Sequence, residues 1–235
     1  MTNNENENSK KIIQAPIWIR PVIVTLVMII VIFLSAGRLN YWQGWVFNIL
    51  FIIFLIITIT ALRDKPELVT ERLKPGEGMK QWDKKFYLLS TLLFLVIIVL
   101  SGLDAGRYQW SPQISLYVYI FSGVIYIMGQ LIFLWAKYTN SFFSSVVRIQ
   151  VERGHTVCQD GPYRFIRHPG YVGTILFTLA SPLLLGSLWA LIPAGITFIP
   201  IVIRTHLEDR TLQEELPGYV DYTKKVRYKL IPYLW

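Results

Sequence analysis

The sequence predicts an all-α, polytopic membrane protein with about five to six transmembrane helices, and its long apolar runs are the first reason. Hydrophobic residues make up 53% of the 235 residues, and the mean hydropathy is +0.43. Charged residues account for only 16% and gather between the apolar runs. A helix needs about 20 apolar residues to cross the hydrocarbon layer. Runs of this kind therefore favour membrane spans over the periodic faces of a soluble core.

The spans can be placed approximately from five apolar blocks, at residues 17–36, 43–62, 86–103, 114–136 and 172–203. The last block has no charged residue and, as one straight helix, would be about 48 Å long, well over the roughly 30 Å needed. Pro182 and the Gly186-Ser187 pair lie near its middle. These residues predict a helical hairpin, with Pro193 and Pro200 kinking the returning arm.

The orientation follows from the distribution of lysine and arginine. The N-terminal segment, the segments 63–85 and 137–168 and the tail from residue 204 hold 21 of the 23 basic residues. The other side of the predicted membrane has only Arg38 and Arg107. Basic residues are retained on the cytosolic side, so both termini and both long loops are predicted to be cytosolic.

We expect one membrane domain with three parts. Residues 1–16 are a polar, mobile tail, residues 17–136 form four transmembrane helices, and residues 137–235 combine a C-terminal hairpin with cytosolic cofactor-binding segments. The run 17–36 is interpreted as a retained first helix, since it exceeds a usual signal sequence and a second span follows at once. The mixed-charge segment 63–85 is expected to be a solvated connector or a short amphipathic surface helix.

Composition also disfavours several classes of function. The net charge of +8 flanks apolar spans, which indicates anionic lipid headgroups rather than nucleic acid. The single cysteine, Cys158, excludes an internal disulfide, and three scattered histidines make a zinc site unexpected. The clean spans before residue 137 also lower the case for a transporter.

The densest group of chemically useful residues lies at 161–171, with the sequence GPYRFIRHPGY. Its Gly-Pro and His-Pro-Gly steps predict tight turns that expose backbone amides. Two arginines, a histidine and two tyrosines suit an anionic or zwitterionic ligand with a ring to stack on. Taken singly, Arg164 and Arg167 could anchor headgroups, His168 could cap the next helix, and both tyrosines could be interfacial.

A second polar group begins where the last apolar block ends. Arg204 and Glu208 share one face of a helix that continues from Ile203. They could form a routine ion pair. Alternatively, the arginine holds a substrate carboxylate while the glutamate holds a ligand's ammonium. Glu208 beside Asp209, just below the membrane, needs a partner or solvent.

The residues 155–171, the apolar hairpin, the Arg204-x-x-x-Glu208 motif and the terminal Tyr219-x-x-Tyr222 and Ile231-Pro232 resemble the isoprenylcysteine carboxyl methyltransferases and their relatives. The resemblance covers about residues 137–235 and implies an integral membrane enzyme that uses S-adenosyl-L-methionine. It implies a lipid-like or prenylated substrate, methylated at a carboxylate, and makes Arg164 and Arg167 structural or headgroup contacts.

By that resemblance, Glu208 holds the amino group of the cofactor and Arg204 faces the substrate. The other implied cofactor contacts are Arg148, His155, Thr156, Val157, Cys158, Tyr163, His168, Pro169, Gly170 and Tyr171. Arg148 departs from the family pattern, because the eukaryotic enzymes carry glutamine there.

Other readings stay open at this point. An amine or phospholipid substrate would imply N-methylation and would need a base, for which Glu208, Asp209 and His206 are candidates. A steroid-reductase type of membrane enzyme has a similar C-terminal region but uses NADPH. A small transporter or assembly factor is the non-enzymatic alternative. The sequence does not indicate the substrate or the oligomeric state.

Overall fold

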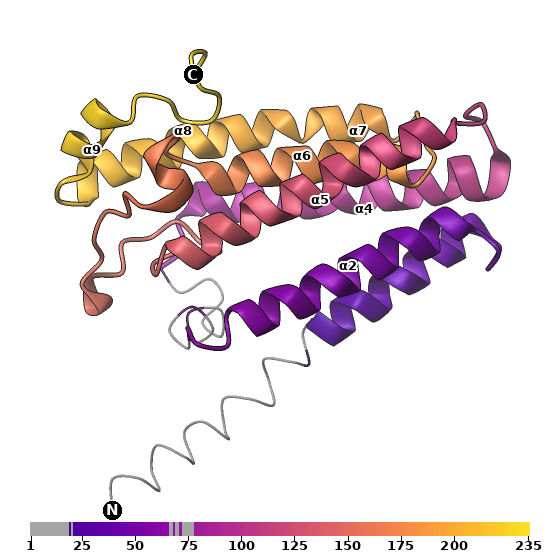
Figure 1. Cartoon of the computed structure of the whole chain (residues 1–235), viewed down its shortest axis with the longest axis horizontal. Helices are drawn as coiled ribbons and strands as arrows, with labels where there is room; N and C mark the ends of the chain where they lie inside the picture. The colour runs from indigo at the N-terminus through magenta and orange to yellow at the C-terminus, as the bar shows by residue number, and fades with distance from the viewer. Residues whose placement is uncertain (1–18, 20, 66–67, 69–70, 72–77) are drawn as a thin grey trace, which may run out of the picture.

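The computed structural model describes residues 19, 21–65, 68, 71 and 78–235, and the described part consists of helices joined by irregular segments (Figure 1). The expected tail 1–16 lies outside the described residues, as do residues 66–67, 69–70 and 72–77 of the segment 63–85, for which a connector or a short surface helix was expected. The all-α membrane architecture predicted from the apolar runs is confirmed.

The apolar helices of the described chain follow the predicted blocks with shifted ends. They are Pro21–Ala36, α2 (Trp42–Ala61), α4 (Gln81–Ser101), α5 (Leu116–Thr139), α6 (Pro169–Leu184), α7 (Leu191–Ile196) and α8 (Phe198–Glu215). Four stretches are long and apolar enough to cross a membrane by length and composition: Trp42–Ala61, Gln81–Tyr108, Leu116–Thr139 and Leu191–Glu215. Large apolar side chains such as Leu88, Ile120 and Leu131 are exposed on them, where lipid would contact them.

The predicted C-terminal hairpin is present, and Gly186 explains its tip. α6 ends at Leu184, and Gly186 follows with φ +82°, a left-handed conformation that glycine adopts freely. The returning arm is broken at Thr197, between α7 with Pro193 and α8 with Pro200. α8 then continues to Glu215, three turns beyond the apolar block, and carries both Arg204 and Glu208.

One expectation about α4 was wrong in detail. The connector was placed at residues 63–85, but α4 begins at Gln81, so that its first turn contains Asp83. Asp83 is fully buried. At its other end, α4 runs into a π-helix, Gly102–Tyr108, whose buried Asp104 accepts hydrogen bonds from the Ser111 backbone and the Ser187 hydroxyl. Asp83 forms an ion pair with Arg204 of α8, and Asp104 is satisfied by its hydrogen bonds. These partners explain how so hydrophobic a helix tolerates two buried acids.

α5 and α6 cross at a pair of glycines. A methyl group added to Gly173 would lie 2.5 Å from the carbonyl oxygen of Gly129, and one added to Gly129 would lie 2.7 Å from that of Gly173. Small residues at such a crossing let two helix backbones approach closely. This contact fixes the beginning of α6, and with it His168 and Tyr171, against the end of α5.

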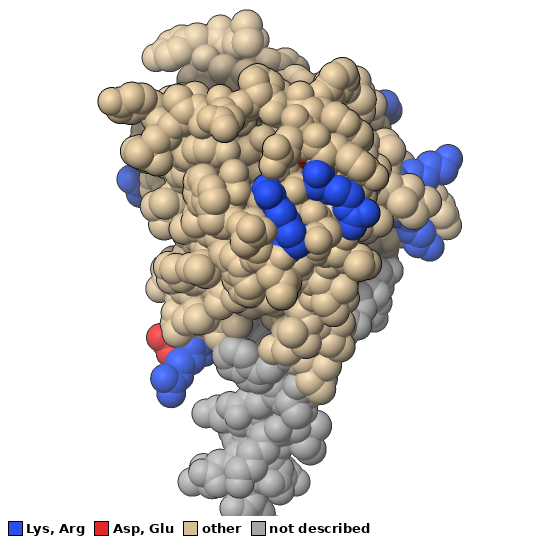
Figure 2. All heavy atoms as spheres, turned by 90° about the vertical axis from the view of Figure 1, so that its right-hand side faces the viewer, with Lys and Arg blue, Asp and Glu red and all other residues tan. Residues whose placement is uncertain are grey.

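The segments predicted to be cytosolic gather at one end of the bundle. Figure 1 shows the C-terminal end of α2, the segment 140–168 and α9 (Tyr219–Lys225) towards the left. The turns 37–41, 109–115 and 185–190 lie at the opposite end. Figure 2 views that opposite end, where the surface is largely uncharged with a few Lys and Arg side chains. The described loops therefore alternate between the two ends of the bundle, while the side of the membrane on which each end lies stays a prediction.

Candidate functional site

The main cavity lies between α4, α5, α6 and α8 at the end that carries the long loops. Its volume is about 470 Å³. Polar groups from segments 140–158 and 163–171 line one part, and rings from three helices line the other part: Phe86, Phe94, Phe133 and Phe177. Arg204 and Glu208 line the same cavity. A single space thus joins a polar part near the loops to an apolar part among the helices.

The structure brings together the residues expected from the sequence, with one exception. Those that line the cavity are Arg148, His155, Thr156, Val157, Cys158, Tyr163, His168, Gly170, Tyr171, Arg204 and Glu208. Pro169 does not line it. Pro169 begins α6, where the lack of a backbone N–H is harmless. Segments far apart in the sequence thus meet where α5 ends, α6 begins and α8 passes beside them.

The segment that contains His155 is held by stacking and burial. The imidazole of His155 stacks on Phe142, with ring centroids 4.5 Å apart, and its Nδ1 lies 3.3 Å from the backbone nitrogen of Gln150. Burial, together with the positive charges of Arg153 and Arg148, lowers the pKa of His155 to about 4. His155 is therefore neutral at pH 7 and offers a flat, uncharged ring to the cavity.

Neighbouring groups in this segment are also uncharged. Burial raises the pKa of the Cys158 thiol above its usual range, so the sulfur stays protonated at neutral pH. Burial likewise raises the pKa of Tyr163, whose hydroxyl lies 3.3 Å from the Ala136 carbonyl oxygen. This wall of the cavity therefore supplies shape and hydrogen bonds rather than charge or a nucleophile.

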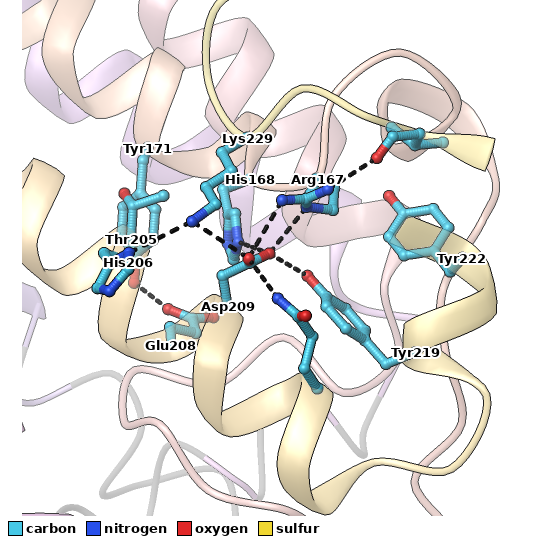
Figure 3. A network of polar contacts seen from close by, with 12 residues as sticks. Arg167, His168, Tyr171, Thr205, His206, Glu208, Asp209, Tyr219, Tyr222 and Lys229 are labelled. Atoms are coloured by element: carbon cyan, nitrogen blue, oxygen red, sulfur yellow. Dashed lines mark hydrogen bonds and ion pairs between the residues drawn. The ribbon is translucent and has the colours of Figure 1, made fainter. Parts of the chain in front are cut away.

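Glu208 and Tyr171 form the most direct polar contact inside the cavity. The Tyr171 hydroxyl donates a hydrogen bond to Oε2 of Glu208 (Figure 3). No ion pair joins Glu208 to Arg204 in the described chain, although they lie four residues apart on α8. Glu208 is half-buried, and among the described residues no hydrogen bond to its Oε1 is found. The routine i,i+4 ion pair is therefore not what this motif forms.

Arg204 is buried and held by α4. Its Nε lies 3.1 Å from Oδ1 of Asp83, and its Nη2 donates to the Ser145 carbonyl oxygen at 2.7 Å. The rings of Phe86 and Tyr87 cover the guanidinium, with centroids 4.4 and 4.8 Å from Cζ. Asp83 was missed by the sequence reasoning because it lies at a helix start, in a segment with no recognisable motif.

Behind His168 lies a network centred on Asp209 (Figure 3). Arg167 donates to both carboxylate oxygens, Nε to Oδ1 at 2.8 Å and Nη2 to Oδ2 at 3.1 Å. His168 Nε2 lies 3.3 Å from Oδ1, and Lys229 Nζ lies 3.4 Å from Oδ2. Tyr219 and Gln213 donate to the same carboxylate. From the sequence, Asp209 was considered only as a candidate base for an amine acceptor. The acidic pair Glu208-Asp209 was expected to need a partner or solvent, and the partner of Asp209 is Arg167.

This network distinguishes between the two roles considered for Arg167, a structural contact and a headgroup contact. A headgroup anchor should be exposed, whereas the Arg167 side chain is only 7% exposed and also donates to the Val226 carbonyl oxygen at 3.0 Å. The backbone nitrogens of Arg167 and His168 bond to Tyr228 and Lys229. Arg167 therefore has the structural role, and ties the C-terminal tail to the site. Arg164, by contrast, is exposed and pairs with Asp160 at 3.2 Å.

Arg148 lines the cavity, but carboxylates already engage its guanidinium. Glu71 accepts from Nε at 3.0 Å and from Nη2 at 2.6 Å, and Glu152 accepts from Nη1 at 2.8 Å. These hydrogen bonds raise the pKa of Arg148 above its ordinary value. Arg148, which departs from the family pattern, therefore joins Glu71 of the connector to the segment 140–158 through its hydrogen bonds.

Residues 120–216 match a family model described as the isoprenylcysteine carboxyl methyltransferase (ICMT) family. The match runs from the first turns of α5 to the end of α8 and contains both motifs that line the cavity. No curated protein matches the chain in the corresponding comparison.

Proposed function

From the domain of the isoprenylcysteine carboxyl methyltransferase family that this integral membrane protein carries, we propose that it transfers a methyl group from S-adenosyl-L-methionine to a carboxylate of a prenylated or lipid-like acceptor. The observation that carries the proposal is the single cavity of about 470 Å³ with a polar and an apolar part. A charged, water-soluble cofactor and a lipophilic acceptor need such a space to meet.

The residues of the polar part suit S-adenosyl-L-methionine. Its ammonium requires an anionic partner, which Glu208 supplies, and its adenine requires a flat, uncharged surface, which the stacked rings of Phe142 and His155 supply. His168 and Gly170 border the same space, where a methyl group on Gly170 would meet the Phe143 ring at 3.1 Å. Pro169 and Arg148 remain assigned to this site only through the resemblance, and their contacts favour support of its walls.

The reaction requires little acid or base catalysis from the protein. The bound cofactor supplies an electrophilic methyl group on a sulfonium. A new bond forms from the carboxylate oxygen to that methyl carbon, while the carbon–sulfur electron pair returns to sulfur as a neutral thioether. A carboxylate acceptor is already ionised at pH 7. Positioning and exclusion of water remain as the protein's contribution, and positioning can be worth about 7–11 kcal/mol.

The acceptor end of the site is defined by Arg204. Its guanidinium is buried where the polar and apolar parts meet, so it can bind a carboxylate whose hydrocarbon chain continues among Phe94, Phe133 and Phe177. A charged buried donor discriminates strongly for an anionic partner. This arrangement supports a carboxylate acceptor over an amine, which would place two cations together.

We further propose that the site opens to the cytosol. The supporting observations are that the segment 140–168 and the C-terminal tail meet at one end, and that the predicted cytosolic segments hold 21 of the 23 basic residues of the sequence. S-adenosyl-L-methionine reaches a site on this side by diffusion, whereas the acceptor arrives through the bilayer.

The direct test is methyl transfer by the purified protein in lipid nanodiscs. Methyl-labelled S-adenosyl-L-methionine is incubated with N-acetyl-S-farnesylcysteine, and the label is measured as base-labile methyl ester. We expect ester formation that is lost in Glu208→Ala and Arg204→Ala. Formation of a base-stable N-methyl product on an aminophospholipid, with no ester, would replace the carboxylate acceptor. Activity with NADPH in place of methyl transfer would replace the reaction class.

A further inference from the structure

Asp83 lies outside the residues that the family model matches, yet its carboxylate contacts Arg204, which lines the cavity. It occupies the first turn of α4, is fully buried, and does not itself line the cavity. Its Oδ1 lies 3.1 Å from Nε of Arg204, and its Oδ2 accepts a hydrogen bond from the Val147 backbone at 2.8 Å. Asp83 therefore stands directly behind the arginine that faces the acceptor.

α4 surrounds the guanidinium on more than one side. Asp83, Phe86 and Tyr87 are spaced i, i+3 and i+4 and thus share a helix face. The Tyr171 ring from α6 lies further off, with its centroid 5.6 Å from Cζ of Arg204. Aromatic faces hold a cation in one plane by electrostatic attraction. One helix thus supplies both the counter-charge and the packing that fix the plane of the guanidinium.

The contacts leave one edge of the guanidinium available. Nε lies 3.1 Å from Oδ1 of Asp83 in an ion-pair contact that lacks hydrogen-bond geometry, and Nη2 donates to the Ser145 carbonyl oxygen. Within the described residues, Nη1 of Arg204 has no hydrogen bond and no ion pair. It is also not one of the fully buried atoms without a partner, so Nη1 is partly accessible. Since Arg204 lines the cavity, this nitrogen is the one positioned to meet an acceptor.

We propose that Asp83 is a positioning residue for the acceptor half of the site, which orients Arg204 so that its free edge faces the acceptor carboxylate. The inference rests on the proposed methyl transfer. It assigns a functional role to the N-terminal half of the chain, which lies before the family domain. It also explains why a costly buried acid is kept at this position, since an arginine without its counter-charge would be left unpaired in an apolar wall.

A positioning role predicts a particular kinetic signature. Asp83 repels an acceptor carboxylate while it orients Arg204. Asp83→Asn removes the repulsion and keeps an oxygen for the Val147 N–H, but it no longer fixes the guanidinium. We therefore expect kcat to fall at least 10-fold, while the KM for the acceptor changes by less than threefold. The Kd for S-adenosylhomocysteine should stay within twofold, because Glu208 and His155 are untouched.

The experiment measures kcat and KM with N-acetyl-S-farnesylcysteine in nanodiscs, together with S-adenosylhomocysteine affinity by calorimetry. In an Arg204→Lys background, Asp83→Asn should lower kcat less than twofold further, because both changes act on one group. Asp160→Asn, which removes the carboxylate of the exposed pair with Arg164, is the matched control and should leave every parameter unchanged.

Each alternative outcome contradicts the inference. Unchanged kcat in Asp83→Asn, or losses that multiply in the Arg204→Lys background, would show that Asp83 does not act through Arg204. If Asp83→Asn alone does not fold, Asp83→Asn with Arg204→Gln removes both charges and should restore S-adenosylhomocysteine binding without turnover. Failure of that double variant to bind would assign Asp83 to the fold. Absence of methyl transfer by the unaltered protein would instead refute the proposed function itself.

Discussion

Arg167 and Asp209 form a buried, two-bond ion pair that joins the beginning of α6 to α8 and holds the C-terminal tail against both. The side chain of Asp209 has no solvent exposure and that of Arg167 has 7%. A buried ion pair stabilises the folded state little more than a well-packed hydrophobic replacement would. Removing one partner, however, leaves an uncompensated buried charge and is strongly destabilising. His168 lies 3.3 Å from the same carboxylate and lines the cavity. The ion pair therefore also supports the part of the cavity that we propose holds the cofactor.

Asp209→Asn should lower the free energy of unfolding by about 3–5 kcal/mol, because Arg167 and Lys229 then lack a counter-charge. The measurement is the chemical or thermal unfolding midpoint in detergent. Asp160→Asn, in the exposed pair with Arg164, should leave the midpoint nearly unchanged. Equal effects of the two substitutions would show that the buried network does not stabilise the site.

Glu208→Gln tests whether the negative charge of Glu208 binds the ammonium of the cofactor, as we propose. Glutamine keeps an oxygen for the Tyr171 hydroxyl, so the fold should be preserved. Hydrogen bonds to charged groups are worth about 1.5–3 kcal/mol, which predicts a loss of S-adenosylhomocysteine affinity of about 10- to 100-fold in calorimetry. Glu214→Gln, on the exposed side of the same helix, is the control and should bind as the unaltered protein does. An unchanged affinity in Glu208→Gln would remove this residue from the cofactor site.

The crossing of α5 and α6 should tolerate no added methyl group. In Gly173→Ala the new Cβ would meet backbone atoms, at 2.5 Å from the Gly129 oxygen and 2.7 Å from the Phe133 nitrogen, so neither neighbour can give way. Overpacking of this kind costs about 1–3 kcal/mol or more. Gly195→Ala in α7 meets nothing within 4 Å and should be neutral or slightly stabilising. Unfolding midpoints of the two variants measure the difference.

The lowered pKa of His155 predicts that the free energy of unfolding depends on pH. Its pKa is about 4 in the folded protein, against 6.5 without the surroundings of the fold. The unfolded chain therefore binds a proton below about pH 6.5 that the folded chain does not, so the stability contributed by neutral His155 is full above pH 6.5 and is lost as the pH falls towards 4. His155→Phe keeps a ring against Phe142 and removes the titration. Between pH 7.5 and 5, the unfolding midpoint of this variant should fall less than that of the unaltered protein. Equal falls would contradict a buried, neutral imidazole.

The sequence allowed the spans and the gathering of the loops to be predicted because both depend on one-dimensional patterns. Apolar runs of membrane length predicted the helices, and Gly186 and Pro182 predicted the turn between α6 and α7. The positions that line the cavity on the C-terminal side followed from the resemblance, since the motifs are contiguous in sequence.

Long-range pairings could not be predicted in the same way. Asp83 meets Arg204 across 121 positions of sequence, and nothing in the connector distinguishes it from solvated acids such as Asp64. Arg167 looked like a headgroup anchor because a basic residue beside an apolar run usually is one. Its burial depends on the C-terminal tail, whose fold over α6 leaves no periodic trace.

The central claim is that the cavity beneath the loops holds S-adenosyl-L-methionine, and direct binding tests it most closely. Purified protein in nanodiscs should be titrated in parallel with S-adenosylhomocysteine and with NADPH by calorimetry. The account predicts saturable, one-site binding of S-adenosylhomocysteine that is weakened in Glu208→Gln, with no heat from NADPH. Saturable binding of NADPH without binding of S-adenosylhomocysteine would contradict it.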